Sequence, residues 1–94
     1  MNEEQFRQEL RARGYAEVQE KDYGPNVDSE MHTHEFSVMV LVKSGEFKLA
    51  LEDGIMTHKP GDWCELEAGT VHAERTGPGG ASILVAKRQL PAGS

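Results

Sequence analysis

The chain has 94 residues, a formal net charge of −6 at pH 7 and a single cysteine, Cys64. A chain of this length forms one domain, and an acidic balance without a basic cluster excludes nucleic acid as a partner, because phosphate binding requires a positively charged surface. One cysteine excludes an internal disulfide, and with neither a signal peptide nor an apolar run long enough to span a bilayer we expect a cytoplasmic protein without a membrane partner.

The first residues carry the signals of a short helix. Asn2 is a suitable N-cap, and Gln5 stands at the position that completes a capping box. Phe6 and Leu10 lie four residues apart and therefore share one helix face. A helix this short is not stable alone, so we assign residues 1–14 to a helix that packs on the rest of the domain.

The remainder of the chain predicts short β-strands separated by turn residues. Turn signals recur about every 8–12 residues, which is typical of a β-sandwich or barrel. We assign residues 15–88 to this barrel and residues 89–94 to a flexible tail. The expected strands cover 15–23, 29–36, 38–42 (as a separate strand or as a continuation of the preceding one), 47–51, 55–59, 63–66, 71–76 and 81–87.

Two histidines two residues apart stand just before the most apolar strand. On an extended strand the side chains of His32 and His34 project to the same face. Two imidazoles on one face form half of a transition-metal site. His72 is the best candidate for a third ligand, and the alternative is that the three histidines only pack or form hydrogen bonds.

Glu74 shares a strand face with His72, because it follows two residues later. It is a candidate fourth ligand, or a group that orients a histidine. The simpler interpretation is a solvent-facing carboxylate at the rim of the barrel. We expect Phe36, Val38 and Val40 to line the pocket, which would make it apolar.

The spacing of these residues resembles the cupins, a superfamily of small jelly-roll barrels. The resemblance covers roughly residues 25–88 and implies an all-β, double-stranded β-helix fold of the kind found in small single-domain bacterial cupins. Two motifs carry it. The first contains His32-Thr33-His34 and Gly45, and the second contains Gly61, Gly69 and His72.

The chain departs from the usual cupin motifs at two positions. Val38 stands where the family usually has its glutamate ligand, and Glu67 replaces a proline. What remains is a set of three neutral histidines, the pattern of the cupin-fold thiol dioxygenases. The resemblance implies a divalent ion, with zinc, nickel, iron, manganese and copper all open.

Two classes of function stay open. The chain is a metal-dependent oxidase, dioxygenase or isomerase acting on a small molecule, or a non-catalytic cupin that binds or senses a small ligand with or without metal. A barrel whose site has decayed is the third interpretation. We also expect a homodimer, because a small barrel with exposed strand edges gains core by pairing.

Overall fold

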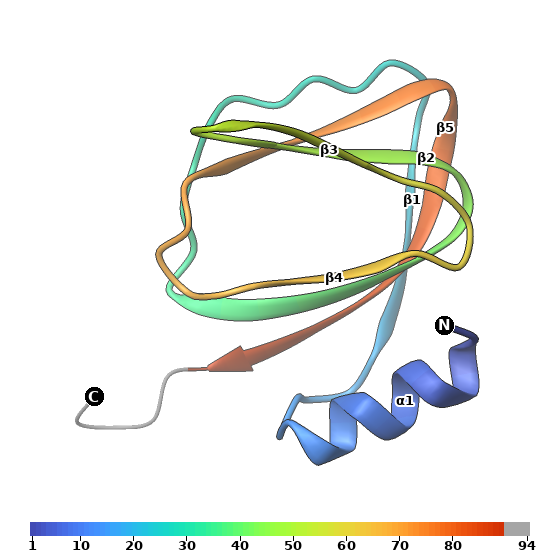
Figure 1. The fold of residues 1–94 in the computed structure, drawn as a ribbon, viewed down its shortest axis with the longest axis vertical. Helices are drawn as coiled ribbons and strands as arrows, with labels where there is room; N and C mark the ends of the chain where they lie inside the picture. The colour runs from blue at the N-terminus through green and yellow to red at the C-terminus, as the bar shows by residue number, and fades with distance from the viewer. Residues whose placement is uncertain (90–94) are drawn as a thin grey trace.

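One helix and five strands make up the part of the chain that the structure, a computed structural model, describes (residues 1–89; Figure 1). Residues 90–94 of the expected tail lie outside the described residues, and Gln89 closes the last strand. The elements are α1 (Glu3–Ala12), β1 (Gln19–Tyr23), β2 (Phe36–Leu51), β3 (Gly54–His58), β4 (Trp63–Leu66) and β5 (His72–Gln89).

The two long strands β2 and β5 form the spine of the barrel. They pair antiparallel along their whole length, from Phe36 opposite Gln89 to Leu51 opposite His72. The strand order is β1-β5-β2-β3, and β4 pairs with the first half of β2. Figure 1 shows the long strands bending, so that the sheet folds over on itself and encloses an interior.

The sequence prediction of separate strands is wrong here, because β2 and β5 each bend and continue as one strand. The predicted strands at 38–42 and 47–51 are both part of β2, and those at 71–76 and 81–87 are both part of β5. The register of β2 against β5 shifts on either side of Gly45, which marks a β-bulge. Gly45 has φ +78°, and a Cβ there would collide with the backbone oxygen of Gly80. The glycines therefore let the strands bend and pass closely instead of ending them.

The predicted strand at 29–36 is also wrong for most of its length. Between Tyr23 and Phe36 the chain makes only isolated bridges to β5, one between Asp28 and Arg75 and one between His32 and His72. The backbone N–H and C=O groups of this segment form hydrogen bonds to β5 at isolated positions and not along a continuous ladder. The segment 29–35 thus crosses the end of the barrel without regular secondary structure, and we call it the strap.

The helix packs on the outside of the barrel. Asn2 Oδ1 accepts a hydrogen bond from Gln5 N at 2.8 Å, and Gln5 Oε1 accepts one from Asn2 N at 3.0 Å, which completes the capping box. Phe6 and Leu10 are buried in a cluster of apolar side chains between the helix and the barrel, which we call the outer core. Its other buried members are Tyr15, Met39, Leu41, Leu84 and Ala86.

A second core fills the interior of the barrel on the opposite face of the same strands. Along β2, Met39 and Leu41 face the helix while Val40 and Val42 face inward. Both faces of this strand are covered, which explains why it is apolar at successive positions. The buried inner core also contains Phe47, Leu49, Ala81 and Ile83. Within residues 1–89 no helix is long and apolar enough to cross a membrane.

Candidate metal centre

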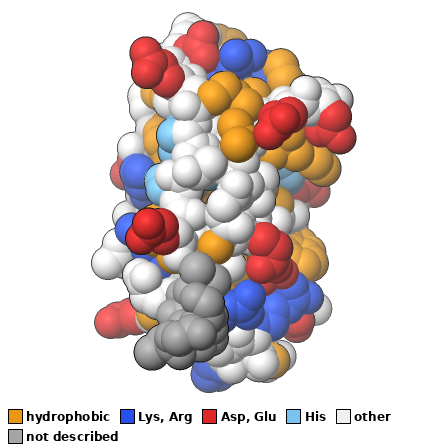
Figure 2. Space-filling model, turned by 90° about the vertical axis from the view of Figure 1, so that its left-hand side faces the viewer, with side chains coloured by type: hydrophobic (Ala, Val, Ile, Leu, Met, Phe, Trp, Pro, Cys, Tyr) orange, Lys and Arg blue, Asp and Glu red, His pale blue; other side chains and the backbone are white. Residues whose placement is uncertain are grey.

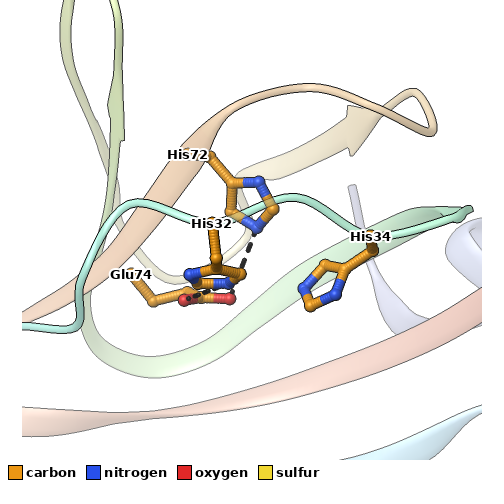
Figure 3. A group of neighbouring side chains, drawn as sticks. All are labelled: His32, His34, His72 and Glu74. Atoms are coloured by element: carbon orange, nitrogen blue, oxygen red, sulfur yellow. Dashed lines mark ion pairs between the residues drawn. The ribbon is translucent and has the colours of Figure 1, made fainter.

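Four side chains from two distant parts of the chain converge at one end of the barrel (Figure 3). His32 and His34 come from the irregular strap before β2, whereas His72 and Glu74 come from the start of β5. One potential ligand atom from each lies within 4.8 Å of every other. The structure therefore brings together all three histidines that the sequence singles out, and with them Glu74, the candidate fourth ligand.

Backbone pairing fixes the position of two of the imidazoles. His32 N donates to His72 O at 2.8 Å, and His72 N donates to His32 O at 3.0 Å. The two ring centroids are 4.5 Å apart. His72 is only 3% exposed, so this end of the site is enclosed.

Backbone carbonyl groups also fix the tautomers of these two histidines. The Nδ1 atom of His32 lies 2.7 Å from Glu30 O, and that of His72 lies 2.9 Å from Thr70 O. A carbonyl oxygen only accepts, so each Nδ1 carries the hydrogen and donates. In the neutral ring each Nε2 then carries the lone pair and faces the cluster, as a metal ligand requires.

The Glu74 carboxylate lies between the two Nε2 atoms. Its Oε2 is 3.2 Å from His32 Nε2, and its Oε1 is 3.5 Å from His72 Nε2 (Figure 3). Ser29 Oγ donates to Glu74 Oε2 at 3.0 Å and accepts from Glu74 N at 2.9 Å. The side chain is 20% exposed. Glu74 is therefore not the solvent-facing rim carboxylate that the simpler interpretation of the sequence expected.

His34 completes the cluster from the side of the strap. Its ring stacks on Phe36 with centroids 4.7 Å apart and planes 12° apart, and it lies 5.2 Å from the His72 ring. Burial lowers the pKa of His34 below its usual value of 6.5, and the positive charges that His32 and His72 would carry lower it further. At neutral pH His34 is therefore uncharged, with a ring nitrogen free to bind a cation.

The donor set fits a divalent transition metal. Three imidazoles and one carboxylate are ligands that zinc, iron(II), nickel, manganese and copper accept. Two atoms that each lie about 2.1 Å from one ion are no more than about 4.2 Å apart. The four donor atoms, within 4.8 Å of one another, need only a small contraction to reach that separation.

A cavity of about 540 Å³ opens beside the cluster and extends into the barrel. Phe36, Val38 and Val40 lie in its wall, as do all four residues of the cluster. Val38, at the position of the usual cupin glutamate, contributes only apolar surface, and the carboxylate comes from β5 instead. Figure 2 shows histidine side chains reaching the surface beside positively charged ones.

Other reactive side chains lie away from the cluster. His58 is buried with its Nδ1 3.3 Å from Phe47 O, and Glu35 is exposed. Cys64 is partly buried, and burial raises the pKa of its thiol to about 12, so it is a poor nucleophile at neutral pH. Ser29 is the residue that sequence reasoning missed. It lies 45 positions from Glu74, and no local pattern connects the two.

Comparison with known proteins identifies the fold. Neither a family model nor a curated protein significantly matches the sequence. A cupin-2 domain protein from Shewanella frigidimarina is 15% identical, with a TM-score of 0.67 over 77% of this chain and 69% of that one. The polyketide cyclase RemF from Streptomyces resistomycificus is 25% identical, with a TM-score of 0.63 over 82% of this chain and 61% of that one.

Enzymes of several kinds share this architecture. A chain from the structures of the DMSP lyases RdDddP and RnDddQII is 26% identical, with a TM-score of 0.70 over 82% of this chain and 40% of that one. A cupin sugar phosphate isomerase from Silicibacter pomeroyi (23% identity, TM-score 0.64, 79% and 50% covered) and the oxalate decarboxylase of Bacillus subtilis (19%, 0.67, 77% and 20%) also match. This chain spans half or less of these three enzyme chains. The protein has the cupin fold, as its motifs indicate.

Proposed function

We propose that the protein binds one divalent transition metal through His32, His34, His72 and Glu74 and holds a small molecule in the adjoining cavity. The convergence of four donor atoms within 4.8 Å carries this proposal. The alternative is a cluster of histidines that only pack against one another. Packing alone does not account for two Nε2 atoms and a carboxylate that meet at one point.

Such a site supports metal-dependent chemistry on a small ligand. A bound ion would act as a Lewis acid and orient a ligand at its open positions. The chain's own residues would hold the metal ligands in place through Ser29 and the carbonyl groups of Glu30 and Thr70, and the apolar wall would exclude water. Among residues 1–89, Glu74 is the only carboxylate in the wall of the cavity. Oxidation or isomerisation therefore fits better than hydrolysis that needs two carboxylates.

A non-catalytic, ligand-binding protein is the second candidate, and one observation favours it. Apart from the metal cluster, most of the cavity wall is aliphatic or aromatic, including Val27, Leu49, Leu66 and Val85. Such a wall binds a ligand mainly through apolar contacts.

Metal binding itself is tested by equilibrium dialysis with elemental analysis. The protein, stripped with a chelator, is dialysed against each of Zn²⁺, Fe²⁺, Mn²⁺ and Ni²⁺. We expect close to one ion per chain for at least one metal, and a much lower content in His32→Ala/His34→Ala. The matched control Glu35→Ala removes an exposed carboxylate from the same strap and should load normally. Equal loading of the double variant and the wild type would overturn the proposal.

A further inference from the structure

We propose that the ligand of this cavity is a small monocarboxylic acid: its carboxylate lies between the metal centre and the ammonium group of Lys87, and its hydrocarbon chain extends into the barrel. This inference rests on the proposed function and adds the class of ligand. Lys87 and all four residues of the metal cluster line the cavity, although the chain as a whole is acidic.

Strand pairing places Lys87 on the cavity side of β5. Lys87 is directly opposite Val38 of β2, which lines the cavity, and directly opposite residues in an antiparallel pair share a face. On its other side, Lys87 O accepts a hydrogen bond from Ala16 N at 3.0 Å. The backbone at Lys87 is thus paired on both sides, so protection of an open strand edge does not explain a lysine at this position.

The ammonium group of Lys87 lies beside the metal cluster. Lys87 Nζ is 4.8 Å from the centroid of Phe36, and this ring stacks on His34 with centroids 4.7 Å apart. The ammonium group is therefore no farther from the His34 ring than these two distances together. Lys87 is exposed and its stem is flexible, so the ammonium group can leave the ring face and meet a ligand atom beside the cluster.

The charge of Lys87 is not neutralised by a carboxylate. Lys87 forms no ion pair within residues 1–89, whereas its neighbour Arg88 pairs with Glu67 at 3.8 Å. A divalent ion held by three neutral imidazoles and Glu74 also keeps a net positive charge. An anion between the ion and Lys87 would neutralise both. A single ammonium group without an arginine fork matches a carboxylate better than a phosphate, which proteins hold with arginine or with backbone N–H groups.

The cavity wall that leads from Lys87 into the barrel is apolar. The next residues on the same face of β2 and β5 are Val40 and Val85, which are directly opposite each other. Both line the cavity, and so do Leu49 and Ile83 of the inner core. A ligand whose carboxylate meets Lys87 can therefore lay a hydrocarbon chain against these side chains, where each buried CH₂ group adds affinity.

Lys21 is a matched control in the same cavity. It is exposed, as Lys87 is, and its Nζ lies 4.9 Å from the centroid of Tyr23. Lys21 is directly opposite Ile83, four residues before Lys87 on β5, which is about 13 Å along the strand. Tyr23 is opposite Ala81, farther still from Lys87. A carboxylate beside the metal cluster is therefore expected to contact Lys87 and not Lys21.

Calorimetric titration tests this inference on protein loaded to one zinc ion per chain. The probes are acetate, butyrate and hexanoate, together with hexanamide, which keeps the chain of hexanoate and lacks its charge. We expect affinity to rise by about two- to fourfold with each added CH₂ group, because the chain becomes buried. Hexanoate should bind about tenfold more tightly than hexanamide, and more tightly than it binds the zinc-free protein.

Two variants separate the role of Lys87 from a general effect of positive charge at the cavity. Lys87→Met removes the ammonium group and keeps most of the stem, so it should bind hexanoate about tenfold more weakly. Lys21→Met should bind hexanoate at least as tightly as the wild type.

Full hexanoate affinity in Lys87→Met would overturn the inference and leave metal binding intact, because Lys87 would then be only a solvated lysine at the rim. An equal loss in both variants, equal affinity for acetate and hexanoate, or no binding of hexanoate to the zinc-loaded wild type would overturn it as well. Failure of the wild type to take up zinc would overturn the proposed function, and the inference with it.

Discussion

His32 and His72 are paired through two backbone hydrogen bonds of 2.8 and 3.0 Å, although forty residues separate them. This bridge is isolated, because the strap that carries His32 makes no continuous ladder with β5. It holds the two imidazoles 4.5 Å apart before any ion binds. The folded backbone thus assembles half of the metal centre, and an unfolded chain does not.

The orientation of Glu74 by Ser29 leads to the first prediction. Ser29→Ala removes the hydroxyl that donates to Glu74 Oε2, so the carboxylate is less well placed. We expect zinc affinity to fall by about 10- to 100-fold, the usual effect of losing a group that orients a ligand. Competition with a chromophoric chelator measures the affinity. Ser82→Ala, which removes a hydroxyl bound to Asp22 outside the site, should leave it unchanged.

The lowered pKa of His34 predicts a pH dependence of the metal-free protein. Between its folded pKa and 6.5, the unfolded chain binds more protons at this residue than the folded chain does. The free energy of unfolding should therefore fall as pH drops below about 6.5 and level off, for this residue, below the folded pKa. Urea denaturation in the presence of a chelator, at a series of pH values, measures it. His34→Gln should show a smaller slope, and an unchanged slope would contradict the assignment.

The contact between the helix and the barrel predicts a large loss of stability on truncation. Leu10 is 4% exposed in the outer core, so Leu10→Ala removes a buried side chain and leaves a cavity. We expect the free energy of unfolding to fall by about 2–4 kcal/mol. Trp63 packs against the same core and can report unfolding by its fluorescence. Arg11→Ala, at an exposed position of the same helix, should change it by less than about 0.5 kcal/mol.

Self-association stays a prediction, and the structure suggests where to test it. β3 is the last strand of the sheet order and exposes 55% of Ile55 and 54% of Met56. An open edge with apolar side chains is a surface that a second copy can cover. We expect sedimentation velocity to show a dimer that Ile55→Lys converts to a monomer. Gln8→Lys adds the same charge to the exposed face of α1 and should remain dimeric.

The sequence predicted the class of fold and the capped helix because both depend on local signals. The capping box of Asn2 and Gln5 and the spacing of Phe6 and Leu10 need only neighbouring residues. The strand boundaries were wrong around Gly45 and Gly80, where glycines bend a long strand in the way they elsewhere end one. Local composition does not distinguish a bend from a turn, since the difference lies in the pairing with another strand.

The metal centre, too, depends partly on local signals and partly on contacts between distant parts of the chain. The strand argument for His32 and His34 rested on a strand that does not form, yet both rings reach the cluster because the strap is tied to β5 at His72. The position of Glu74 depends on Ser29, which is distant in sequence. Motif spacing brought His72 to attention, and Glu74 is a candidate fourth ligand from its place two residues later, whereas its contact with Ser29 became evident only from the fold.

We propose that His72 completes a metal site that exists only in the folded protein, and the thermal shift on adding zinc measures this. An ion that binds only the native state stabilises it by mass action. At a free zinc concentration one hundred times the dissociation constant, this amounts to about 2.7 kcal/mol, which raises the Tm of a domain this small by about 10 °C or more.

His72→Ala and His58→Ala are the matched pair of variants for this measurement. Both remove a buried histidine, 3% and 6% exposed, so both should lower the Tm of the metal-free protein. Only His72 belongs to the cluster. We expect His58→Ala to keep the full zinc-induced shift and His72→Ala to lose most of it. A full shift in His72→Ala would contradict the account, because the metal would then bind elsewhere.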